Sequence, residues 1–590
     1  MPTNTAPTTL TDAAQSPTPP NGLPRRAMLA GTAAGAGAVA FGPRAAAGSN
    51  AATDPTLAAK AAKRRVRHFQ HGVASGDPLP EAVLIWTRVT PHRKATPGSG
   101  KGPRVSVRWE VARDKKFRKI VRRGTFATSA SRDHTVKVDV RGLEPEKWYY
   151  YRFVFRGQKS PVGRTRTAPA KHSVPDHLRF GVVSCTNLQA GYFTAYRALA
   201  QRTDLHAVLH LGDYLYEYAP GEYGYGNANV DVRPHDPPHE MVSLSDYRRR
   251  HAQYKSDPDL MALHRAYPWI ITWDDHEVTN DQWKSGAENH QSDEGNYLKR
   301  RARAHRAYDE WMPVRMDGTA RLRDGDRLFR RLRFGRLAEI SMLDLRTYRS
   351  EQVNTAFPTP VPAAESEISD PDRSITGERQ MAWLKQSLSR RDQQWKIIGN
   401  PVMIAPVTFA AVPDEVLAPI NDVTGLLPDQ GLPYNVDQWD GYTHDRREVF
   451  THIKNHQIDG ALFVTGDIHS GWACDLPFNR GSYPLGGSAG VEFVCSSITS
   501  NNLKDLLGAP RRTASIPVEQ TILANNPHIK YLNFDDHGFS VLDITSKRAQ
   551  FDWFIIGDRA EQNTSVTWTK SMATTAGSNT VHEVNKPVGA

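Results

Sequence analysis

The sequence predicts a mixed α/β protein, in which an N-terminal all-β sandwich of immunoglobulin or fibronectin type precedes a larger α/β domain. Three observations support this fold class. Apolar and polar residues alternate in short runs between residues 68 and 168, which is typical of half-buried strands. From Leu178 onward, strand-like and helix-like segments alternate, as they do around a covered sheet. The length of 590 residues exceeds that of one typical domain.

The first 47 residues are expected to be a signal peptide. They contain the pair Arg25-Arg26, a mildly apolar run that ends at Phe41, and the small residues Ala45-Ala46-Ala47, which is the order found in twin-arginine signals. The apolar run is too short to span a bilayer. We therefore expect export by the twin-arginine machinery, a secreted protein without a transmembrane anchor, and a linker over residues 48–67.

The sandwich, expected over residues 68–168, contains four strand signals separated by turn residues. These are Val83–Thr87, Val105–Trp109, Thr135–Val140 and Trp148–Phe155. The α/β domain is expected over residues 178–560, and residues 561–590 are expected to be a C-terminal extension or tail. The predicted helices are Tyr196–Arg202, Ser245–Leu263, Asn296–Trp311, Glu378–Arg391 and Asp445–Lys454.

Charge and cysteine content narrow the possible partners and cross-links. The formal net charge is +12 and the pI about 9.4. This balance favours anionic partners such as phosphate esters, lipid surfaces or wall polymers, although a solvated basic surface explains it equally well. No nucleic-acid fold motif accompanies the basic runs, so no specific nucleic-acid partner is expected. Three cysteines exclude a complete disulfide framework, while Cys474 and Cys495 could pair.

Four segments of the α/β domain share one pattern, an apolar run followed by side chains of metal-ligand type. They are Phe180–Cys185, Ala207–Glu217, Trp269–Glu277 and Ala461–His469. A free carboxylate inside a buried strand is costly to desolvate, whereas the carboxyl end of a strand accommodates one. A single Asp after a strand is usually a cap or turn residue. Four such ends in order predict a shared metal site at one edge of the sheet.

These segments resemble known metallophosphoesterases. Together they resemble the PhoD-type alkaline phosphatases and the related iron-dependent phospholipase D enzymes, which belong to the calcineurin-like metallophosphoesterase superfamily. The resemblance covers roughly His68 to Asp558 and implies a metallophosphoesterase α/β sandwich. The matching blocks are His71–Pro78, Val183-Ser184-Cys185, Gly212-Asp213-Tyr214-Leu215-Tyr216, Trp273-Asp274-Asp275-His276-Glu277 and Gly466-Asp467-Ile468-His469.

The resemblance implies a site that holds Fe³⁺ and Ca²⁺. Asp213 would bridge two cations, and Cys185, Tyr216 and His469 would bind iron with it. The superfamily has Asn and His where this chain has Asp275 and Asp467, and hard carboxylate oxygens favour calcium over zinc. For a second calcium, Asn187 and Asn280 are weak candidates, each more readily explained as structural.

Two residues are expected to act on the phosphate group. The resemblance implies that His276 contacts the phosphate and assists the leaving group, although it could instead only orient Asp274 or Asp275. Arg346 could clamp a phosphate oxygen in bidentate fashion or pair with Asp344. His537 is a further candidate to approach the site from the C-terminal strands.

The predicted function is that of a secreted phosphoester hydrolase in which a metal-activated hydroxide attacks phosphorus. A phosphodiesterase of phospholipase D or teichoic-acid type would use the same site and remains the alternative. A secreted binding protein would require the loss of a ligand, and the matched positions are intact. A nuclease would require activity on DNA or RNA and a steep salt dependence.

Overall fold

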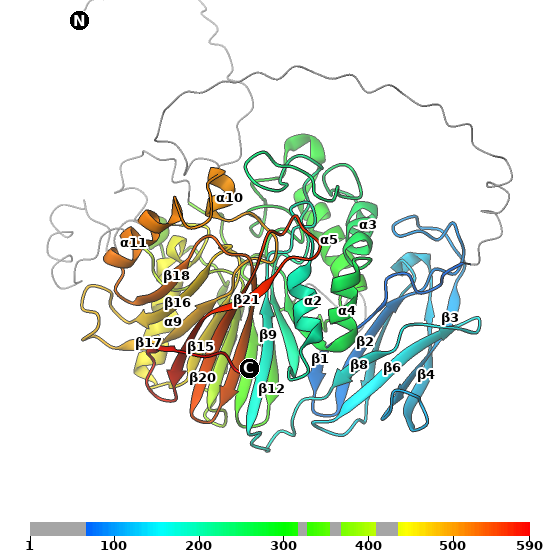
Figure 1. Ribbon diagram of the computed structural model, residues 1–590, viewed down its shortest axis with the longest axis horizontal. Coiled ribbons are helices and arrows are strands. Elements are labelled where there is room, and N and C mark those ends of the chain that lie inside the picture. The colour runs from blue at the N-terminus through cyan, green and yellow to red at the C-terminus, as the bar shows by residue number, and fades with distance from the viewer. Residues whose placement is uncertain (1–65, 317–326, 354–366, 409–434, 590) are drawn as a thin grey trace, which may run out of the picture. The chain divides into compact units, whose positions relative to one another are not determined.

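The computed structural model describes residues 66–316, 327–353, 367–408 and 435–589. The expected signal peptide and almost all of the expected linker lie outside these residues. Three sheets of ten, seven and five strands organise the described chain (Figure 1). Among the described residues, no helix combines the length and apolar character needed to cross a membrane.

The ten-stranded sheet runs through the centre of the fold. Its strands, in spatial order, are β22 (Val581–Val584), β21 (Val566–Thr575), β20 (Arg548–Ile556), β19 (Gly538–Thr545), β9 (His177–Val183), β10 (Ala207–Leu211), β11 (Pro268–Thr272), β1 (Val73–Leu79), β2 (Ala82–Arg88) and β5 (Thr135–Arg141). The neighbours β9, β10 and β11 are parallel, so their carboxyl ends lie at the same edge.

The seven-stranded sheet packs face to face against the first. Its order is β12 (Arg330–Phe334), β13 (Ala338–Met342), β14 (Trp395–Asn400), β15 (Ala461–Thr465), β17 (Ser488–Val494), β16 (Gly471–Pro477) and β18 (Ile529–Asn533). Apolar side chains of both sheets, among them Phe180, Leu209, Ile397 and Leu462, form one core between them. This buried layer brings the carboxyl ends of strands from both sheets together.

Helices cover the outer faces of the two sheets, which gives the predicted α/β sandwich. One core joins the ten-stranded sheet to α2 (Thr194–Gln201), α3 (Leu244–Tyr254), α4 (Pro258–Ala266) and α5 (Tyr297–Trp311). The other joins the seven-stranded sheet to α7 (Glu378–Leu388), α9 (Thr443–Asn455) and α11 (Ser515–Asn525). The short helix α10 (Leu503–Leu507) follows β17.

The N-terminal β structure is confirmed, but its strands are divided between two sheets. The small sheet contains β3 (Val105–Ala112), β4 (Ile120–Thr128), β6 (Trp148–Phe155), β7 (Gln158–Lys159) and β8 (Gly163–Arg166). It packs on β1, β2 and β5 around a core that includes Val107 and Val136. However, β1 pairs in parallel with β11 of the α/β domain. The sandwich is therefore continuous with the larger domain, which leaves no exposed edge at β1.

Two predicted boundaries differ from the structure. The expected tail after residue 560 contains β21 and β22, which extend the ten-stranded sheet and place Met572 and Val581 in the core between the sheets. The single helix expected over Ser245–Leu263 is two helices. Asp257 caps α4 through the backbone N–H groups of residues 259 and 260, and Pro258 occupies the first turn, where proline is tolerated because its missing N–H would be unpaired.

The pairing considered for Cys474 and Cys495 does not occur. All three cysteines are free and buried. Cys474 lies in the core beneath α7 and α9, while Cys495 lies in the core between the sheets. The two thiols therefore point to opposite faces of the same sheet, which forbids disulfide geometry.

Candidate metal centre

The candidate ligands lie just beyond the carboxyl ends of four strands. Cys185 follows β9, Asp213 follows β10, Asp275 follows β11 and Asp467 follows β15 of the other sheet. The backbone joins the first two turns, because Cys185 N–H donates to the Gly212 carbonyl at 3.2 Å and Thr186 N–H to the Asp213 carbonyl at 2.8 Å. The predicted convergence of segments far apart in the sequence is therefore present.

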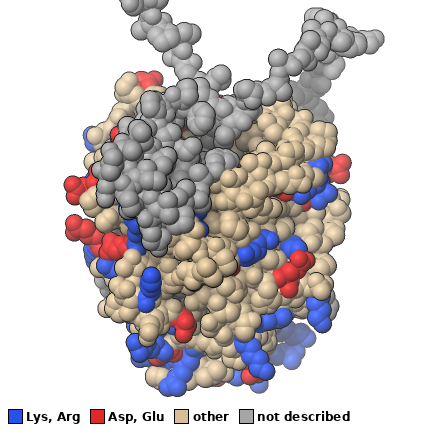
Figure 2. All heavy atoms as spheres, turned by 90° about the vertical axis from the view of Figure 1, so that its left-hand side faces the viewer, with Lys and Arg blue, Asp and Glu red and all other residues tan. Residues whose placement is uncertain are grey.

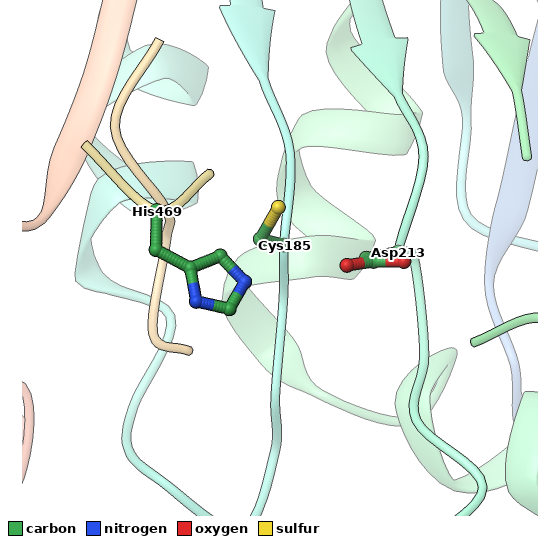
Figure 3. A group of neighbouring side chains, drawn as sticks. All are labelled: Cys185, Asp213 and His469. Atoms are coloured by element: carbon green, nitrogen blue, oxygen red, sulfur yellow. The ribbon is translucent and has the colours of Figure 1, made fainter. Parts of the chain in front are cut away.

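Four of the candidate ligands, counting His469, adopt the left-handed backbone conformation. The φ angles are 57° at Cys185, 56° at Asp213, 63° at Asp467 and 55° at His469. Non-glycine residues rarely adopt positive φ, and such strain gathers where side chains must be aimed at a site. Figure 3 shows the side chains of Cys185, Asp213 and His469 lying next to one another, although they come from separate segments.

Asp213 is common to three groups of candidate metal ligands. Within each group, the donor atoms lie within 4.8 Å of one another. The groups are Cys185, Asp213 and His469; Asp213, Asp275 and His276; and Asp213, Asp274 and Asp467. Tyr216 belongs beside the first group, since its hydroxyl donates to Asp213 Oδ2 at 2.9 Å and lies 3.4 Å from His469 Nε2. One carboxylate therefore faces both a Cys/Tyr/His set and an oxygen-rich set.

His469 and Cys185 each place a donor atom within 4.8 Å of Asp213. His469 Nδ1 lies 2.7 Å from the Asn501 carbonyl, which can only accept, so Nδ1 carries the proton and Nε2 presents its lone pair. Burial, together with Asp213 and Asp467, raises the pKa of the Cys185 thiol well above its usual value. A bound cation would reverse that balance by stabilising the thiolate.

The residues present fit metal ions. Asp213 Oδ1 is buried and accepts no hydrogen bond from the described residues. The carboxylates of Asp213, Asp274, Asp275 and Asp467 are all almost completely buried, and burial raises the pKa of Asp213 well above its usual value. Closely spaced buried carboxylates require cations or protons to offset their desolvation. The thiolate, phenolate and imidazole donors suit a transition metal, and the carboxylates suit a hard cation.

His276 lies against the ligands with one nitrogen available. Its Nδ1 donates to Glu217 Oε2 at 2.7 Å, while Nε2 has no hydrogen-bond partner among the described residues. Its ring lies against Tyr216, with centroids 4.1 Å apart. Burial opposes protonation, but the carboxylates of Asp275, Glu217 and Asp213 outweigh it and raise the pKa of His276 to about 10. Cations on those carboxylates would weaken that effect.

Arg346 occupies a different place from either role considered for it. Its guanidinium donates to both carboxylate oxygens of Asp274, at 2.5 and 2.8 Å, and to both of Asp437, at 2.8 and 2.9 Å. It also lies 3.8 Å from carboxylate oxygens of Asp275 and Asp467. The side chain is fully buried. In this structure two carboxylates bind its side-chain donors, and its contact with Asp344 is made by the backbone N–H at 3.3 Å.

Two glutamates hold the ligand turns in place. Glu277 accepts the backbone N–H groups of Asp213, Tyr214 and Asp274 at 3.2, 2.6 and 2.9 Å. Glu217 accepts from His276 and from the backbone of Asn280 at 2.7 Å each. Glu277 lies inside a matched block and Glu217 directly follows one, and we did not predict their roles because each acts on atoms of another turn.

The remaining candidate residues, Asn187, Asn280 and His537, form hydrogen bonds with other protein groups. Asn187 donates to the Tyr223 carbonyl at 2.6 Å, and Asn280 donates to Glu288 at 3.1 Å. His537 contacts Asp505 at 2.8 Å and the Ser497 hydroxyl at 2.9 Å. Gln438 was not predicted, and it donates to Asp467 Oδ2 at 3.1 Å.

The fold and the site define the chain as a phosphoesterase of two joined β and α/β parts. Models of the PhoD-like phosphatase family match residues 180–553, and models of its N-terminal domain match residues 54–169. The chain therefore belongs to the PhoD-like phosphatase family. It is 39% identical to alkaline phosphatase D of Bacillus subtilis (strain 168) over 490 residues, which is 83% of this chain and 77% of the relative. A solved structure of PhoD superposes with a TM-score of 0.76 at 34% identity, covering 88% of this chain and 93% of that one.

Proposed function

We propose that the chain is a secreted, metal-dependent alkaline phosphatase of PhoD type that hydrolyses phosphomonoesters at the edge of the sheets. The observation that carries this proposal is the position of Asp213, which belongs to all three groups of donor atoms. A carboxylate shared by adjacent cations is suited to hold two ions at the spacing that one phosphoryl group can bridge.

We assign the two kinds of ion to two sides of Asp213. The Cys185, Tyr216 and His469 side offers thiolate, phenolate and imidazole donors, which suit Fe³⁺. The Asp275 and Asp467 side offers oxygen donors, which suit Ca²⁺. The donor chemistry and the relationship to a metal-dependent phosphatase family support this assignment.

The chain's own residues would orient the substrate and handle charge. Bound ions would supply Lewis acidity and an activated water for in-line attack on phosphorus. His276 presents Nε2 beside the same carboxylates, where it can donate to a phosphoryl or leaving-group oxygen. Glu217 holds the ring so that this nitrogen faces the site. Arg346 keeps Asp274 close to the other carboxylates by balancing their charge.

The direct test of this proposal is the variant Asp213→Asn. We expect activity to fall at least about 10³-fold, in line with the loss of a central catalytic group, and metal content to fall with it. Asp543→Asn is the matched control. Asp543 is also a buried carboxylate, but it pairs with Arg179 near the amino-terminal end of β9, whereas the site lies beyond the carboxyl end of that strand. Unchanged activity and metal content in Asp213→Asn would rule out this site.

Substrate preference distinguishes the phosphatase from the phosphodiesterase alternative. A phosphatase should hydrolyse nitrophenyl phosphate faster than bis-nitrophenyl phosphate or phosphatidylcholine. A faster rate on either diester, lost in Asp213→Asn, would keep the site but assign it to a phosphodiesterase of phospholipase D or teichoic-acid type.

Export is supported by the twin-arginine pattern at Arg25-Arg26. We expect the full chain to appear outside the cell in processed form, and Arg25→Lys with Arg26→Lys to retain it inside. Secretion of the double variant at the original level would contradict the twin-arginine route.

A contact with an anionic surface is supported by the small N-terminal sheet. Arg108, Arg123 and Arg152 flank Glu110 on its outer face, across β3, β4 and β6, whereas Figure 2 shows both signs of charge interspersed on another face. Binding to vesicles containing anionic lipid, but not to neutral vesicles, should weaken as salt rises. Equal binding to both kinds of vesicle would contradict an electrostatic contact.

A further inference from the structure

We propose that Arg559 is a positioning residue for the metal ligands His469 and Tyr216, and that it acts through the segment Ser497–Asp505. This inference rests on the proposed function, because it concerns how the chain holds the proposed ligands. Arg559 lies after β20, 90 residues beyond His469 in the sequence. Its side chain is only 1% exposed.

The guanidinium of Arg559 makes contacts in three directions. Its Nε donates to the Ala190 carbonyl at 3.0 Å, and Nη2 donates to Asn501 Oδ1 at 2.5 Å. Its Nη1 donates to the carboxylate of Asp505, and His537 contacts both groups. Each contact fixes a different direction of the planar group, a geometry that lysine cannot reproduce.

The segment held in this way contacts the ligands directly. The Asn501 carbonyl accepts a hydrogen bond from His469 Nδ1 at 2.7 Å. The Ser500 hydroxyl lies 2.6 Å from the Tyr216 hydroxyl and 2.9 Å from the Cys185 carbonyl. Asn501 is also clamped to the loop after Tyr216, since Nδ2 donates to the Gly224 carbonyl at 2.9 Å and Oδ1 accepts from Gly226 N–H at 3.0 Å.

Charge also ties Arg559 to this segment. Asp505 is a buried carboxylate, and the neighbouring His537, Arg559 and Lys504 hold its pKa well below its usual value. Two cations pair with Asp505, namely Lys504, whose side chain is 20% exposed, and Arg559, whose side chain is 1% exposed. Loss of Arg559 would remove the more deeply buried of these cations from a buried carboxylate and release Asn501 and Ser500 from their fixed positions.

The test is metal retention by Arg559→Met in the purified full protein. We expect iron release to a chelator to become about 10- to 100-fold faster, the usual effect of losing a group that orients a ligand. We also expect a shifted or weakened visible absorption band from the thiolate and phenolate donors. Arg559→Lys should restore part of the retention, because an ammonium group can pair with Asp505 but cannot reach Ala190 and Asn501 as well.

Asn501→Ala tests the same link by a second route if Arg559→Met fails to fold. It keeps the backbone carbonyl and removes the side chain that Arg559 and the Gly224–Gly226 loop hold, so release should accelerate in the same direction.

Arg88→Met is the matched control. Arg88 is fully buried and pairs with Asp133 in the N-terminal part. The Arg88→Met substitution should lower the stability of the protein without changing the iron release rate or the absorption band. If Arg559→Met or Asn501→Ala leaves both properties at the wild-type values, the inference fails while the proposed function stands. If the wild-type protein holds no metal at Asp213, the proposed function itself fails.

Discussion

Arg346 offsets the negative charge of several buried carboxylates. It pairs with Asp274 and Asp437 and lies 3.8 Å from Asp275 and Asp467, with no exposed side-chain surface. Replacing it with methionine would leave Asp274 without this cation, while Asp437 would keep its ion pair with Arg349. Such losses cost about 3–5 kcal/mol when the partner stays buried.

We therefore predict that Arg346→Met lowers the unfolding free energy of the metal-free protein by about 3 kcal/mol and weakens metal binding. Denaturant unfolding with and without metal measures both effects, and Arg346→Lys should lie between the variant and the wild type. If stability is unchanged and only KM for a phosphomonoester rises, Arg346 acts as the phosphate clamp instead.

The direct ligands could be predicted at this scale because each signal is local. Cys185, Asp213 and Asp467 each follow an apolar strand within two residues, and the family blocks fix their identity. The places of Glu277, Asn501 and Arg559 could not be predicted, since they bind backbone or side-chain atoms of distant segments. Arg346 was found as a residue but its surroundings were not, because the four carboxylates around it come from three segments that are far apart in the sequence.

At the scale of elements, Lys255 lies buried at the end of α3. Its Nζ donates to the Tyr214 hydroxyl at 2.9 Å and lies 3.2 Å from His264 Nε2. Burial holds the pKa of Lys255 well below its usual value. The folded protein therefore keeps this amine neutral at a pH where the unfolded chain protonates it.

This difference predicts that Lys255 costs stability near neutral pH. Because the unfolded state binds the extra proton, the cost shrinks by up to about 1.4 kcal/mol per pH unit as the pH rises toward about 10.4. Lys255→Met should be more stable than the wild type at about pH 7, and the gap should narrow by about pH 9. Urea unfolding at both pH values measures it. A gap that stays constant or widens would contradict a neutral buried amine.

The last two strands lead to a second prediction about elements. Met572 is 3% exposed and Ala573 is fully buried, and the N–H of Val588 donates to Asp552 at 2.8 Å. A chain that ends at Ser565 would lose these contacts and expose the edge of β20, which invites aggregation. We expect a loss of about 2–5 kcal/mol or more and a lower solubility. If the truncated chain instead unfolds at the same denaturant concentration as the wild type, residues 566–590 are not needed for stability.

The positions of helices and strands could be predicted wherever the hydrophobic periodicity was strong. The residues at which these elements begin and end could not. The strand signals at Val105 and Trp148 and the helix that ends at Trp311 match β3, β6 and α5. The break at Asp257-Pro258 was missed because apolar spacing continues through it. The strand role of Val566–Thr575 was missed because its outward residues are polar, and only pairing with β20 makes it a strand.

At the scale of the molecule, the site depends on two sheets that meet at one edge. β9, β10 and β11 supply Cys185, Asp213 and Asp275 from the first sheet, and β15 supplies Asp467 and His469 from the second. The core between the sheets fixes the spacing of those ends. The fold class could be predicted from the alternation of strands and helices, but the continuity of the sandwich with the large sheet depends on the long-range pairing of β1 with β11.

The most direct measurement of the central claim is a crystal structure of the purified protein with anomalous scattering recorded above and below the iron edge. The account predicts an iron peak within bonding distance of Cys185 Sγ, His469 Nε2 and an oxygen of Asp213, with a second cation on the other side of Asp213. Metal peaks located only elsewhere in the protein, or these side chains pointing away from one another, would contradict it.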